Sequence, residues 1–218
     1  MNSINVLSLN VGMSSTLAGL RALISSNDFH LIFLQEVKNT DADLNMFLRN
    51  LGFHIVLNVD TEMSSKPGTA VIWKDSLKVD NVLNLVKFRA QAVVLGSCVF
   101  FNIYGPSGSD KRRERYHFFS HEVFEALLMF PGSRFVLSGD FNCITSPLDV
   151  ENGTGFSQKN CHALKDLISA YNLKDGFRIH NPRAKEFTFF RPGKAASRID
   201  RIYIPSEFSE NASVSHVA

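Results

Sequence analysis

Five polar side chains lie where apolar runs of the sequence end, and their types suit chemistry on a phosphate. Asn10 and Glu36 close the first two runs, Tyr104 closes a later one, and the stretch RFVLSGDFN ends in Asp140 and Asn142. Function gathers at strand ends in α/β folds, because a rigid sheet holds side chains there while leaving them open to solvent. Each residue alone has a structural explanation, such as a turn cap, a surface carboxylate or a core ring. The repeated pattern favours a shared site.

These groups suit hydrolysis of a phosphodiester. Glu36 offers the hard oxygen ligand that Mg²⁺ prefers, since this ion uses one or two carboxylates and completes its shell with water and phosphate. Asp140 is suited to orient or deprotonate a water, while Asn142 and Asn10 donate to phosphate oxygens and Tyr104 adds a phenol. Hydrolysis of sugars is disfavoured, because it uses two facing carboxylates and no amide donors. The sequence contains no P-loop and no GxGxxG nucleotide motif.

The elements that must position these side chains are short apolar strands interspersed with helices. The expected strands cover residues 4–11, 30–37, 68–74, 91–106, 134–142, 186–190 and 197–204. Helical spacing of apolar residues predicts helices over 17–24, 44–51, 116–129 and 161–171. Strands outnumber helices and several follow one another directly, which favours two packed sheets over an alternating Rossmann sheet. The prediction is an α/β fold, a four-layer α/β/β/α sandwich of two mainly antiparallel or mixed β-sheets flanked by helices.

The composition is that of one ordinary globular domain. The chain has 218 residues, of which 44% are hydrophobic and 20% charged, so we expect a single domain over residues 1–218. A formal net charge of +2 allows no more than a local basic face. Cys98, Cys143 and Cys161 are odd in number and show no CxxC spacing, which favours free thiols in a reducing compartment. No apolar run approaches the ~20 residues of a membrane span, so no membrane partner is expected.

Five short motifs, in this order, resemble the endonuclease/exonuclease/phosphatase superfamily. They are SLN ending at Asn10, LQE ending at Glu36, NIYGP around Tyr104, SGDFN over 138–142 and SRID ending at Asp200. Within the superfamily, SPLD at 146–149 and FTFFRPGKAASRID at 187–200 are closest to the apurinic-like endonuclease domain of non-LTR (LINE-type) retrotransposons. The resemblance runs from Leu7 to about Ile204. Each motif is a weak signal alone, and their order at strand ends makes the set specific.

The resemblance implies a Mg²⁺-dependent enzyme that nicks double-stranded DNA and leaves a 3′ hydroxyl, from which reverse transcription of the element's RNA is primed. Glu36 would be the ligand of Mg²⁺, with Mn²⁺ as the alternative metal, and Asn10 would support it. Asp140 would activate the attacking water, while Asn142 and Tyr104 would hold the scissile phosphate. The resemblance also implies fusion to a reverse transcriptase in a longer polyprotein and a nuclear location.

Asp200 would orient a catalytic histidine, and at that histidine the chain departs from the family pattern. The family finishes with a Ser-Asp-His motif on a last strand, whereas this chain ends in SVSHVA, with His216 after Ser215. Either the chain stops before the final C-terminal strand, or His216 takes the place of the histidine. The first interpretation is favoured, because His216 follows Asp200 sooner than expected. It predicts a chain that binds DNA and cuts it feebly.

A turn between two expected strands offers a contact to DNA. Pro192 and Gly193 favour a tight turn in the stretch FFRPGKAAS, and Arg191 and Lys194 place positive charge at its tip. Composition alone favours a solvated tip. The resemblance implies a hairpin that enters a DNA groove and influences which sequence is nicked, by reading shape more than base identity. The residues expected to contact DNA are Thr188, Arg191, Lys194, Ser197 and Arg198.

A second basic stretch, DKRRERYH over 110–117, follows the YGPSG loop. It fits a charged helix start with intrahelical ion pairs, and it fits equally a patch that follows DNA phosphates. Both interpretations stay open.

Two other functions also stay open. The same core site serves relatives that act on abasic DNA, phosphoinositides or sphingomyelin, so an apurinic/apyrimidinic endonuclease or another phosphoesterase is the second hypothesis. A non-catalytic DNA-binding module is the third, suggested by the departure from the terminal motif. The basic hairpin and the basic stretch favour DNA over a lipid headgroup.

Overall fold

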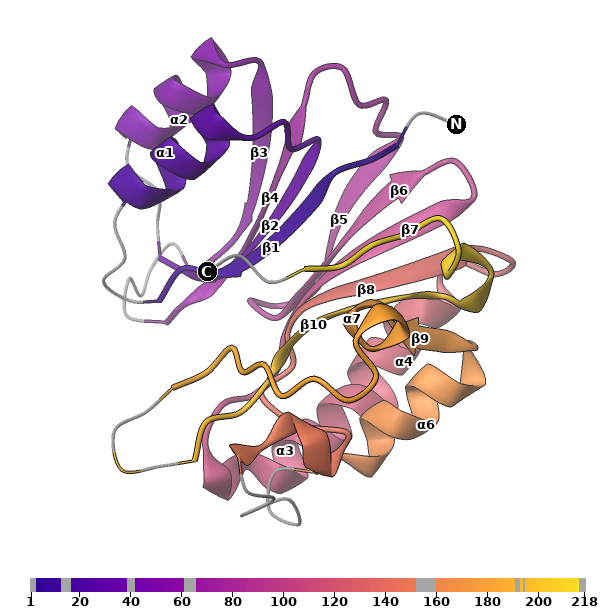
Figure 1. Cartoon of the computed structure of the whole chain (residues 1–218). Helices are drawn as coiled ribbons and strands as arrows, with labels where there is room; N and C mark the ends of the chain where they lie inside the picture. The colour runs from indigo at the N-terminus through magenta and orange to yellow at the C-terminus, as the bar shows by residue number, and fades with distance from the viewer. Residues whose placement is uncertain are drawn as a thin grey trace.

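Two β-sheets packed face to face form the centre of the molecule, and helices cover the outer face of each sheet (Figure 1). The computed structural model describes residues 3–12, 17–38, 42–60, 66–151, 160–190, 193 and 195–215. Across the molecule the layers are helix, sheet, sheet and helix. The expected four-layer sandwich is therefore confirmed.

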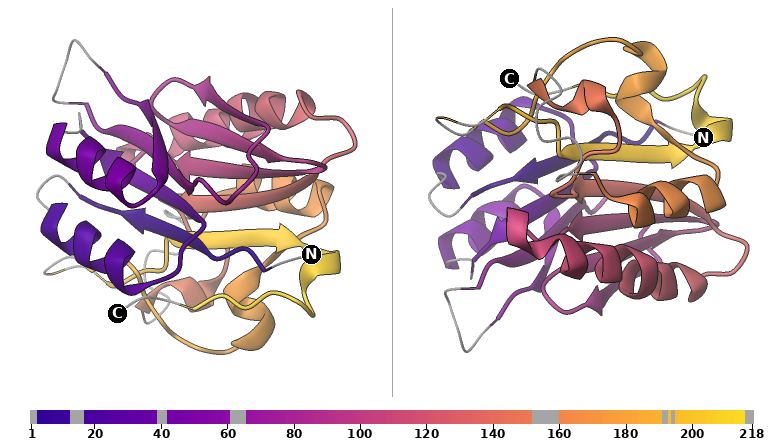
Figure 2. Two further views of the ribbon diagram at one scale, coloured as in Figure 1. Left: turned by 90° about the horizontal axis from the view of Figure 1, so that it is seen from above. Right: turned by 90° about the horizontal axis from the view of Figure 1, so that it is seen from below.

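The first sheet has four strands in the order β1-β2-β4-β3. They are β1 (Val6–Asn10), β2 (Leu31–Val37), β3 (Phe53–Asn58) and β4 (Gly68–Lys74). β1 and β2 are parallel, and the other pairs are antiparallel. β2 is a nearly unbroken apolar run because both of its faces are buried, as suits a central strand. The helices α1 (Leu17–Ser26) and α2 (Ala42–Asn50) cover the outer face of this sheet (Figure 2).

The second sheet has six strands in the order β5-β6-β7-β8-β10-β9. They are β5 (Asn81–Val86), β6 (Ala90–Leu95), β7 (Cys98–Tyr104), β8 (Arg134–Asp140), β9 (Leu173–Asp175) and β10 (Asp200–Pro205). β7 and β8 are parallel, and the other pairs are antiparallel. Both sheets are therefore mixed, as the sequence predicts.

The helices on the outer face of the second sheet come from two stretches of the chain (Figure 2). They are α3 (Arg112–His117), a π-helical turn (Phe118–Glu122), α4 (Val123–Leu128) and α6 (His162–Ala170). The short α7 (Gly176–His180) follows β9 and contacts β9 and β10, and its Ile179 packs against the apolar cluster between the two sheets. Short 3₁₀ turns lie at Ser109–Lys111, Pro147–Asp149 and Ser206–Phe208. Among the described residues, no helix has the length and apolar character needed to cross a membrane.

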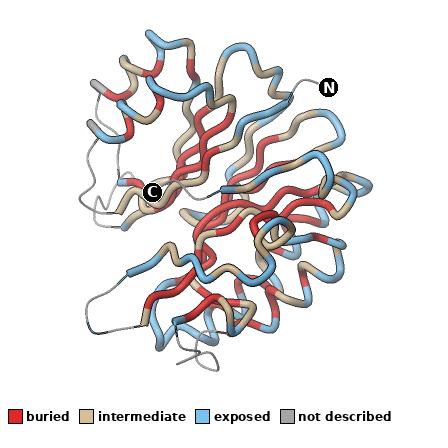
Figure 3. Tube along the Cα trace, viewed as in Figure 1, coloured by how far each residue is buried: buried red, intermediate tan, exposed pale blue. Residues whose placement is uncertain are grey.

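Three apolar clusters fill the spaces between the layers, and buried residues concentrate along the strands (Figure 3). One cluster lies between the first sheet and its helices, and another lies between the second sheet and its helices. The middle cluster joins the sheets and contains Leu31, Phe33, Val71, Val93, Phe100, Val136 and Ile204. Burial of these side chains is the main force that holds the sheets face to face.

Buried amide side chains tie the two sheets together beside the middle cluster. Gln35 of β2 donates from Nε2 to Oδ1 of Asn102 in β7 at 2.8 Å. Asn102 Nδ2 donates in turn to the carbonyl oxygens of Leu34 and Ala70 in the first sheet, at 3.1 and 2.9 Å. Both amides are fully buried, so these bonds form away from competing water. They fix the position of one sheet against the other at the ends of β2 and β7.

The observed elements differ from the expected ones where the sequence pattern is weak. The sequence does not predict β3, β5, β9 or α7. β3 and β5 are edge strands with partly exposed faces, whereas β9 and α7 are too short to show a period. The run 91–106 divides into β6 and β7 at a turn where Gly96 adopts φ +58°. The strand expected over 186–190 contributes a single bridge, between Phe189 and Ser197.

We expect Asn102→Ala to lower the free energy of unfolding by about 2–4 kcal/mol, because it leaves buried donors and acceptors of both sheets without partners. Urea titration followed by far-UV circular dichroism measures this change. Asn50→Ala is the matched control, since Asn50 is exposed at the end of α2 and its loss should change stability by less than ~0.5 kcal/mol. Equal stabilities for the two variants would show that the amide ties do not hold the sheets.

Candidate active site

The polar side chains at the strand ends converge on one place, and they come from both sheets. Tyr104, Asp140 and Asp200 face one another in register across the neighbouring strands β7, β8 and β10. Asn10 ends β1 in the first sheet, and Glu36 lies in β2 beside it. Because the two sheets are packed face to face, the first-sheet pair meets the second-sheet group at one edge of the sandwich.

Asn10 joins the two halves of the site. Its Nδ2 donates to Glu36 Oε1 at 3.1 Å and to Asp140 Oδ2 at 2.9 Å. Its own Oδ1 accepts from the backbone N–H of Gly12 at 2.9 Å, which fixes the orientation of the amide. One side chain therefore holds carboxylates that are far apart in the sequence.

The backbone takes unusual conformations where it presents these groups. Glu36 lies at an irregularity in the pairing of β2 with β4 and has φ +58°, and Asn142 has φ +50°. Bulges and left-handed residues cost energy and re-aim side chains, so they cluster at functional sites. Gly139 has a different reason to be glycine, because a Cβ there would lie 1.9 Å from the carbonyl oxygen of Ile103. The close approach of β8 to β7 needs this glycine.

Asp140 is the most buried acid of the group and is 2% exposed. Its Oδ1 accepts from the backbone N–H of Asn142 at 2.8 Å, and its Oδ2 accepts from Asn142 Nδ2 at 3.2 Å. Burial raises the pKa of Asp140 well above its ordinary value, the nearby Asp200 carboxylate raises it further, and the bonds from Asn142 and Asn10 oppose the rise. A carboxylate with a raised pKa is a stronger base toward water.

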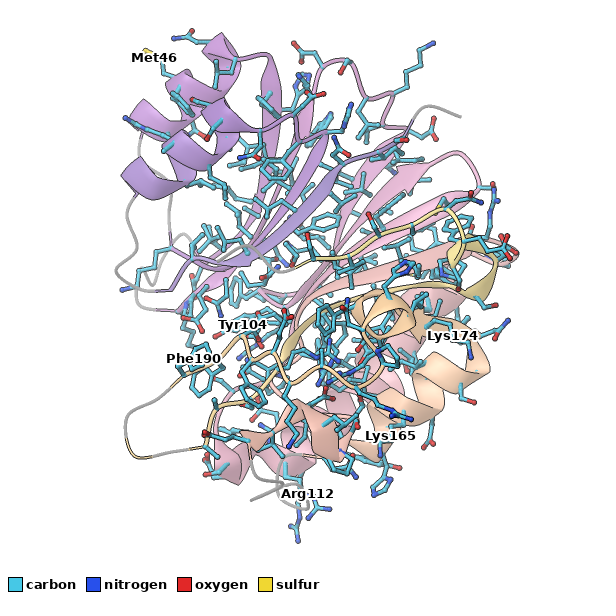
Figure 4. The ribbon with its side chains drawn as sticks, viewed as in Figure 1. Met46, Tyr104, Arg112, Lys165, Lys174 and Phe190 are labelled. Carbon is cyan, nitrogen blue, oxygen red and sulfur yellow. The ribbon has the colours of Figure 1, made fainter. Side chains whose placement is uncertain are left out.

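Tyr104 and Asn142 border the same carboxylates. The Tyr104 hydroxyl lies 3.5 Å from Glu36 Oε1, and Figure 4 shows the phenol at this edge of the sandwich. Burial and the negative charge of Glu36 raise the pKa of Tyr104, so the phenol keeps its proton and remains a donor. Asn142 Nδ2 also donates to the Gly105 carbonyl at 3.0 Å, which ties the loop after β8 to the loop after β7.

Asp200 begins β10 with one carboxylate oxygen unpaired. Within the described residues, Asp200 Oδ1 is buried and has no hydrogen-bond partner. Its backbone N–H donates to Thr188 Oγ1 at 3.2 Å. Burial raises the pKa of Asp200 to about 6, against the lowering effect of Thr188 and Arg201. A buried, unpaired carboxylate oxygen is costly and calls for a donor.

The acids of the site fit a divalent ion that takes one or two ligands from the protein and the remaining oxygen ligands from water or phosphate. Glu36 is half-buried, and its Oε1 is oriented by Asn10 and Tyr104. No group of three His, Cys, Asp or Glu side chains in the described chain is arranged to hold a metal. Mg²⁺ does not need such a cage, because it uses one or two carboxylates and keeps several waters. The donor set fits Mg²⁺ better than it fits a structural zinc site.

The structure corrects the expected DNA contact by Arg198. Its side chain is 1% exposed and bonds to Asp149 Oδ1, from Nε at 3.1 Å and from Nη2 at 2.9 Å, and it also pairs with Asp175. The guanidinium is therefore committed to buried carboxylates rather than to solvent. Both acids are distant from Arg198 along the chain, and only the fold brings them together.

The other residues expected to contact DNA have different positions. Ser197 is fully buried, and its backbone N–H donates to Phe189 O at 3.0 Å. Thr188 is half-buried, and its hydroxyl accepts from the backbone of Ile199 and Asp200, so it supports Asp200. Arg191 and Lys194 lie outside the described residues, as does His216.

Asp149 of the SPLD stretch forms a buried ionic centre behind the site. It pairs with Arg178 at 2.8 Å, with Arg198 at 2.9 Å and with Arg201 at 3.1 Å. These cations hold the pKa of Asp149 far below its usual range, against the opposing effect of burial. The SPLD stretch is evident in the sequence, but no role for Asp149 was predicted from it. The signal was the capping box in which Ser146 and Asp149 exchange bonds with each other's backbone.

The basic stretch after β7 begins a helix, in line with one of its two interpretations. Lys111 and Glu114 form an ion pair three residues apart at 2.9 Å. Arg115 is buried and donates to the carbonyl oxygens of Pro106 and Gly108 at 2.9 and 2.6 Å, which fixes the loop after Tyr104. Arg112 is exposed and points away from the body of the molecule (Figure 4).

Comparisons with known proteins agree with this fold. The sequence pattern of the Endonuclease/Exonuclease/phosphatase family matches residues 4–217. No curated protein matches the chain. An AP endonuclease from Archaeoglobus fulgidus has the same fold, with a TM-score of 0.76 at 18% identity over 95% of this chain and 88% of that one.

Two further solved structures are similar. The 3′ phosphatase NExo from Neisseria, bound to a product DNA hairpin, gives a TM-score of 0.72 at 20% identity over 95% of this chain and 88% of that one. The catalytic domain of Xenopus laevis APE2 gives 0.69 at 20% identity over 94% of this chain and 82% of that one. At such identities these likenesses establish the fold.

We expect Asp200→Asn to stabilise the protein at neutral pH. The folded pKa of Asp200, about 6, lies above the value of about 4 for an unfolded aspartate, so the native state binds the extra proton and loses stability as the pH rises through this window. The asparagine variant should therefore gain up to about 2 kcal/mol over the parent at pH 7.5 and lose this advantage near pH 4.

Urea titrations in chelating buffer across this pH range measure the gain. Asp166→Asn, at an exposed position of α6, is the control and should follow the parent at every pH. Parallel curves for Asp200→Asn and the parent would contradict the assignment of a raised pKa.

Proposed function

The chain belongs to the endonuclease/exonuclease/phosphatase family, and from this premise we propose that it is a metal-dependent endonuclease that nicks double-stranded DNA and leaves a 3′ hydroxyl. The carrying observation is the bridge made by Asn10, which holds Glu36 of one sheet and Asp140 of the other within 3.1 Å and 2.9 Å of one amide nitrogen. This arrangement supports Glu36 as a metal ligand beside Asp140 as a general base.

The proposed reaction is an in-line displacement at phosphorus. Asp140 takes a proton from the attacking water, since its raised pKa suits a general base and its bonds to Asn10 and Asn142 hold it in place. The bond from phosphorus to the 3′ oxygen breaks, and that oxygen leaves with a proton from solvent. Tyr104, which keeps its proton, and Asn142 donate to the phosphate oxygens as charge grows on them.

Glu36 is the proposed ligand of Mg²⁺, with Mn²⁺ as an alternative, and Asn10 orients its carboxylate. When bound, such an ion supplies positive charge that stabilises the phosphate as negative charge develops on it. The other proposed contacts to the phosphate come from side chains of the chain itself.

Asp200 is proposed to orient a histidine at the phosphate. Its Oδ1 is buried and unpaired among the described residues, and an imidazole N–H is a donor that suits a buried carboxylate oxygen. The chain leads from β10 past α7, where Ala212 O lies 2.8 Å from His180 Nε2, and continues to Ser215. His216 follows directly in the sequence.

We further propose that the nick serves retrotransposition. The SPLD stretch and the FTFFRPGKAASRID stretch support a nuclease of LINE-type retrotransposons, whose nick primes reverse transcription by a fused enzyme in the nucleus. The neighbours described as AP endonuclease and as a phosphatase bound to DNA favour DNA as the substrate. Abasic DNA remains the alternative substrate, because the same fold carries that activity in the Archaeoglobus protein.

Asp140→Asn and Glu36→Gln should each lower Mg²⁺-dependent nicking of supercoiled plasmid by about 10³-fold or more, without changing the melting temperature by more than a few degrees. Asp166→Asn is the matched control at an exposed acid and should nick as the parent does. Normal nicking by either site variant would show that the mechanism is wrong. If His216 takes the place of the terminal histidine, His216→Ala should lower nicking in the same assay. If the chain instead stops before the final strand, His216→Ala should nick as the parent does.

The parent should prefer plasmid or duplex DNA over a soluble inositol phosphate, with an abasic duplex as the third substrate. A higher kcat/KM on the inositol phosphate would overturn the proposed function, and a preference for the abasic duplex would select the alternative.

Changing both Arg191 and Lys194 to alanine should redistribute the nick positions on a plasmid and lower the total rate less than about tenfold, because a basic tip in a groove reads local shape. Primer extension across the nicked plasmid maps the positions. Arg183→Ala, at an exposed residue before the hairpin, should leave the map unchanged. An unchanged map for the double variant would remove the hairpin from target choice.

A further inference from the structure

Arg89, in the turn between β5 and β6, lies against the site and was not assigned a role by the sequence. Its guanidinium carbon is 4.6 Å from the centre of the Tyr104 ring, and its Nη1 donates to the Gly105 carbonyl at 3.2 Å. Its backbone oxygen accepts from the Tyr104 N–H at 2.8 Å. Arg89 therefore contacts both the residue that ends β7 and the residue after it.

The turn that carries Arg89 is held rigidly by the other sheet. Asn58, buried at the end of β3, donates from Nδ2 to Val86 O at 2.9 Å, and its Oδ1 accepts from the Phe88 N–H at 3.0 Å. Phe88 adopts φ +64°, which is a costly backbone conformation for an aromatic residue and persists only where the surrounding structure holds it. A turn fixed in this way presents its side chain with little loss of entropy when a ligand binds.

The charge of Arg89 lies against the Tyr104 ring. Across the described residues, its guanidinium forms no ion pair with a carboxylate, and it contributes no buried nitrogen without a partner. Arg89 is half-buried, and the five N–H donors of its guanidinium outnumber the bonds that Nη1 makes to the loop after Tyr104 in the described chain. Arg198 and Arg201 differ in this respect, because buried acids take up their charge.

We propose that Arg89 is a phosphate-binding residue of the site, which donates to a nonbridging oxygen of the DNA phosphate held beside Tyr104. The planar guanidinium suits this bond, because its parallel N–H groups match the oxygens of phosphate. The site otherwise presents the acids Glu36, Asp140 and Asp200, which repel an anion, and a fixed cation at its edge offsets that repulsion. This inference rests on the proposed nuclease function and adds a contact that it does not require.

The first measurement is binding of a short intact duplex to proteins that carry Asp140→Asn, at a series of KCl concentrations. Removing one phosphate contact should reduce the slope of log Kd against log salt by about 0.9. Arg89→Gln should show that reduction. Arg89→Lys should keep the slope, because it keeps the charge. Lys87→Gln is the matched control in the same turn, since Lys87 is exposed and contacts the ring of Phe88, so it should leave the slope unchanged.

The second measurement is kcat/KM for nicking by proteins with Asp140 intact. Arg89→Gln should lower it about 10- to 100-fold, as expected for loss of a charge-assisted hydrogen bond, and Arg89→Lys should lower it less. Thermal melting separates these effects from unfolding. If Arg89→Gln fails to fold, Arg89→Lys carries the test, and a parental kcat/KM for that variant would overturn the proposed guanidinium contact.

The outcomes distinguish this inference from the function on which it rests. Parental slope and parental kcat/KM in a folded Arg89→Gln would overturn the phosphate contact and leave the nuclease intact. Failure of the parent chain to bind or nick DNA would overturn the proposed function, and the inference with it.

Discussion

The position of one sheet against the other is the constraint on which the site depends. Asn10 and Glu36 come from the first sheet and Asp140 from the second, so neither sheet carries the site alone. Apolar packing is non-directional and would tolerate small slides of one sheet over the other. The buried bond between Gln35 and Asn102 has one geometry, and these residues lie one position before Glu36 and two before Tyr104. The register is thus fixed where the chemistry needs it.

A buried ionic cluster around Asp149 fixes the start of β10, and it contributes to geometry more than to stability. Asp149 and its three arginines give up hydration that their mutual attraction only partly restores, so such clusters add little net stability over well-packed apolar side chains. They do specify geometry. Arg201 follows Asp200 directly, and its Nη1 also donates to the Cys143 carbonyl at 2.8 Å in the loop after β8. The cluster therefore positions β10 and the loop that carries Asn142 relative to each other.

The sequence predicts the central strands and the site residues for the same physical reason. A strand buried on both faces is apolar until it reaches solvent. The apolar runs of β2 and β8 therefore predict both the strand and the polar side chain at its end. Edge strands such as β5 carry a mixed pattern that a loop can share. Contacts between residues far apart in the sequence also leave no local signal. The sequence around Arg198 does not show its ion pair, because Asp149 lies 49 residues away. The contact of Arg89 with Tyr104 likewise forms only when β6 pairs with β7.

The neighbouring buried acids of the site indicate an arrangement that serves a ligand rather than stability. Asp140 and Asp200 lie opposite each other on neighbouring strands, and burial together with their mutual repulsion raises the pKa of Asp140. A fold selected for stability alone would replace one of these acids, because each buried charge weakens the native state. A bound cation would stabilise acids that repel one another, and the Arg89 guanidinium is a positive group beside Tyr104 at the same site. The repulsion that costs the fold stability thus favours binding of a positively charged ligand at this edge of the sandwich.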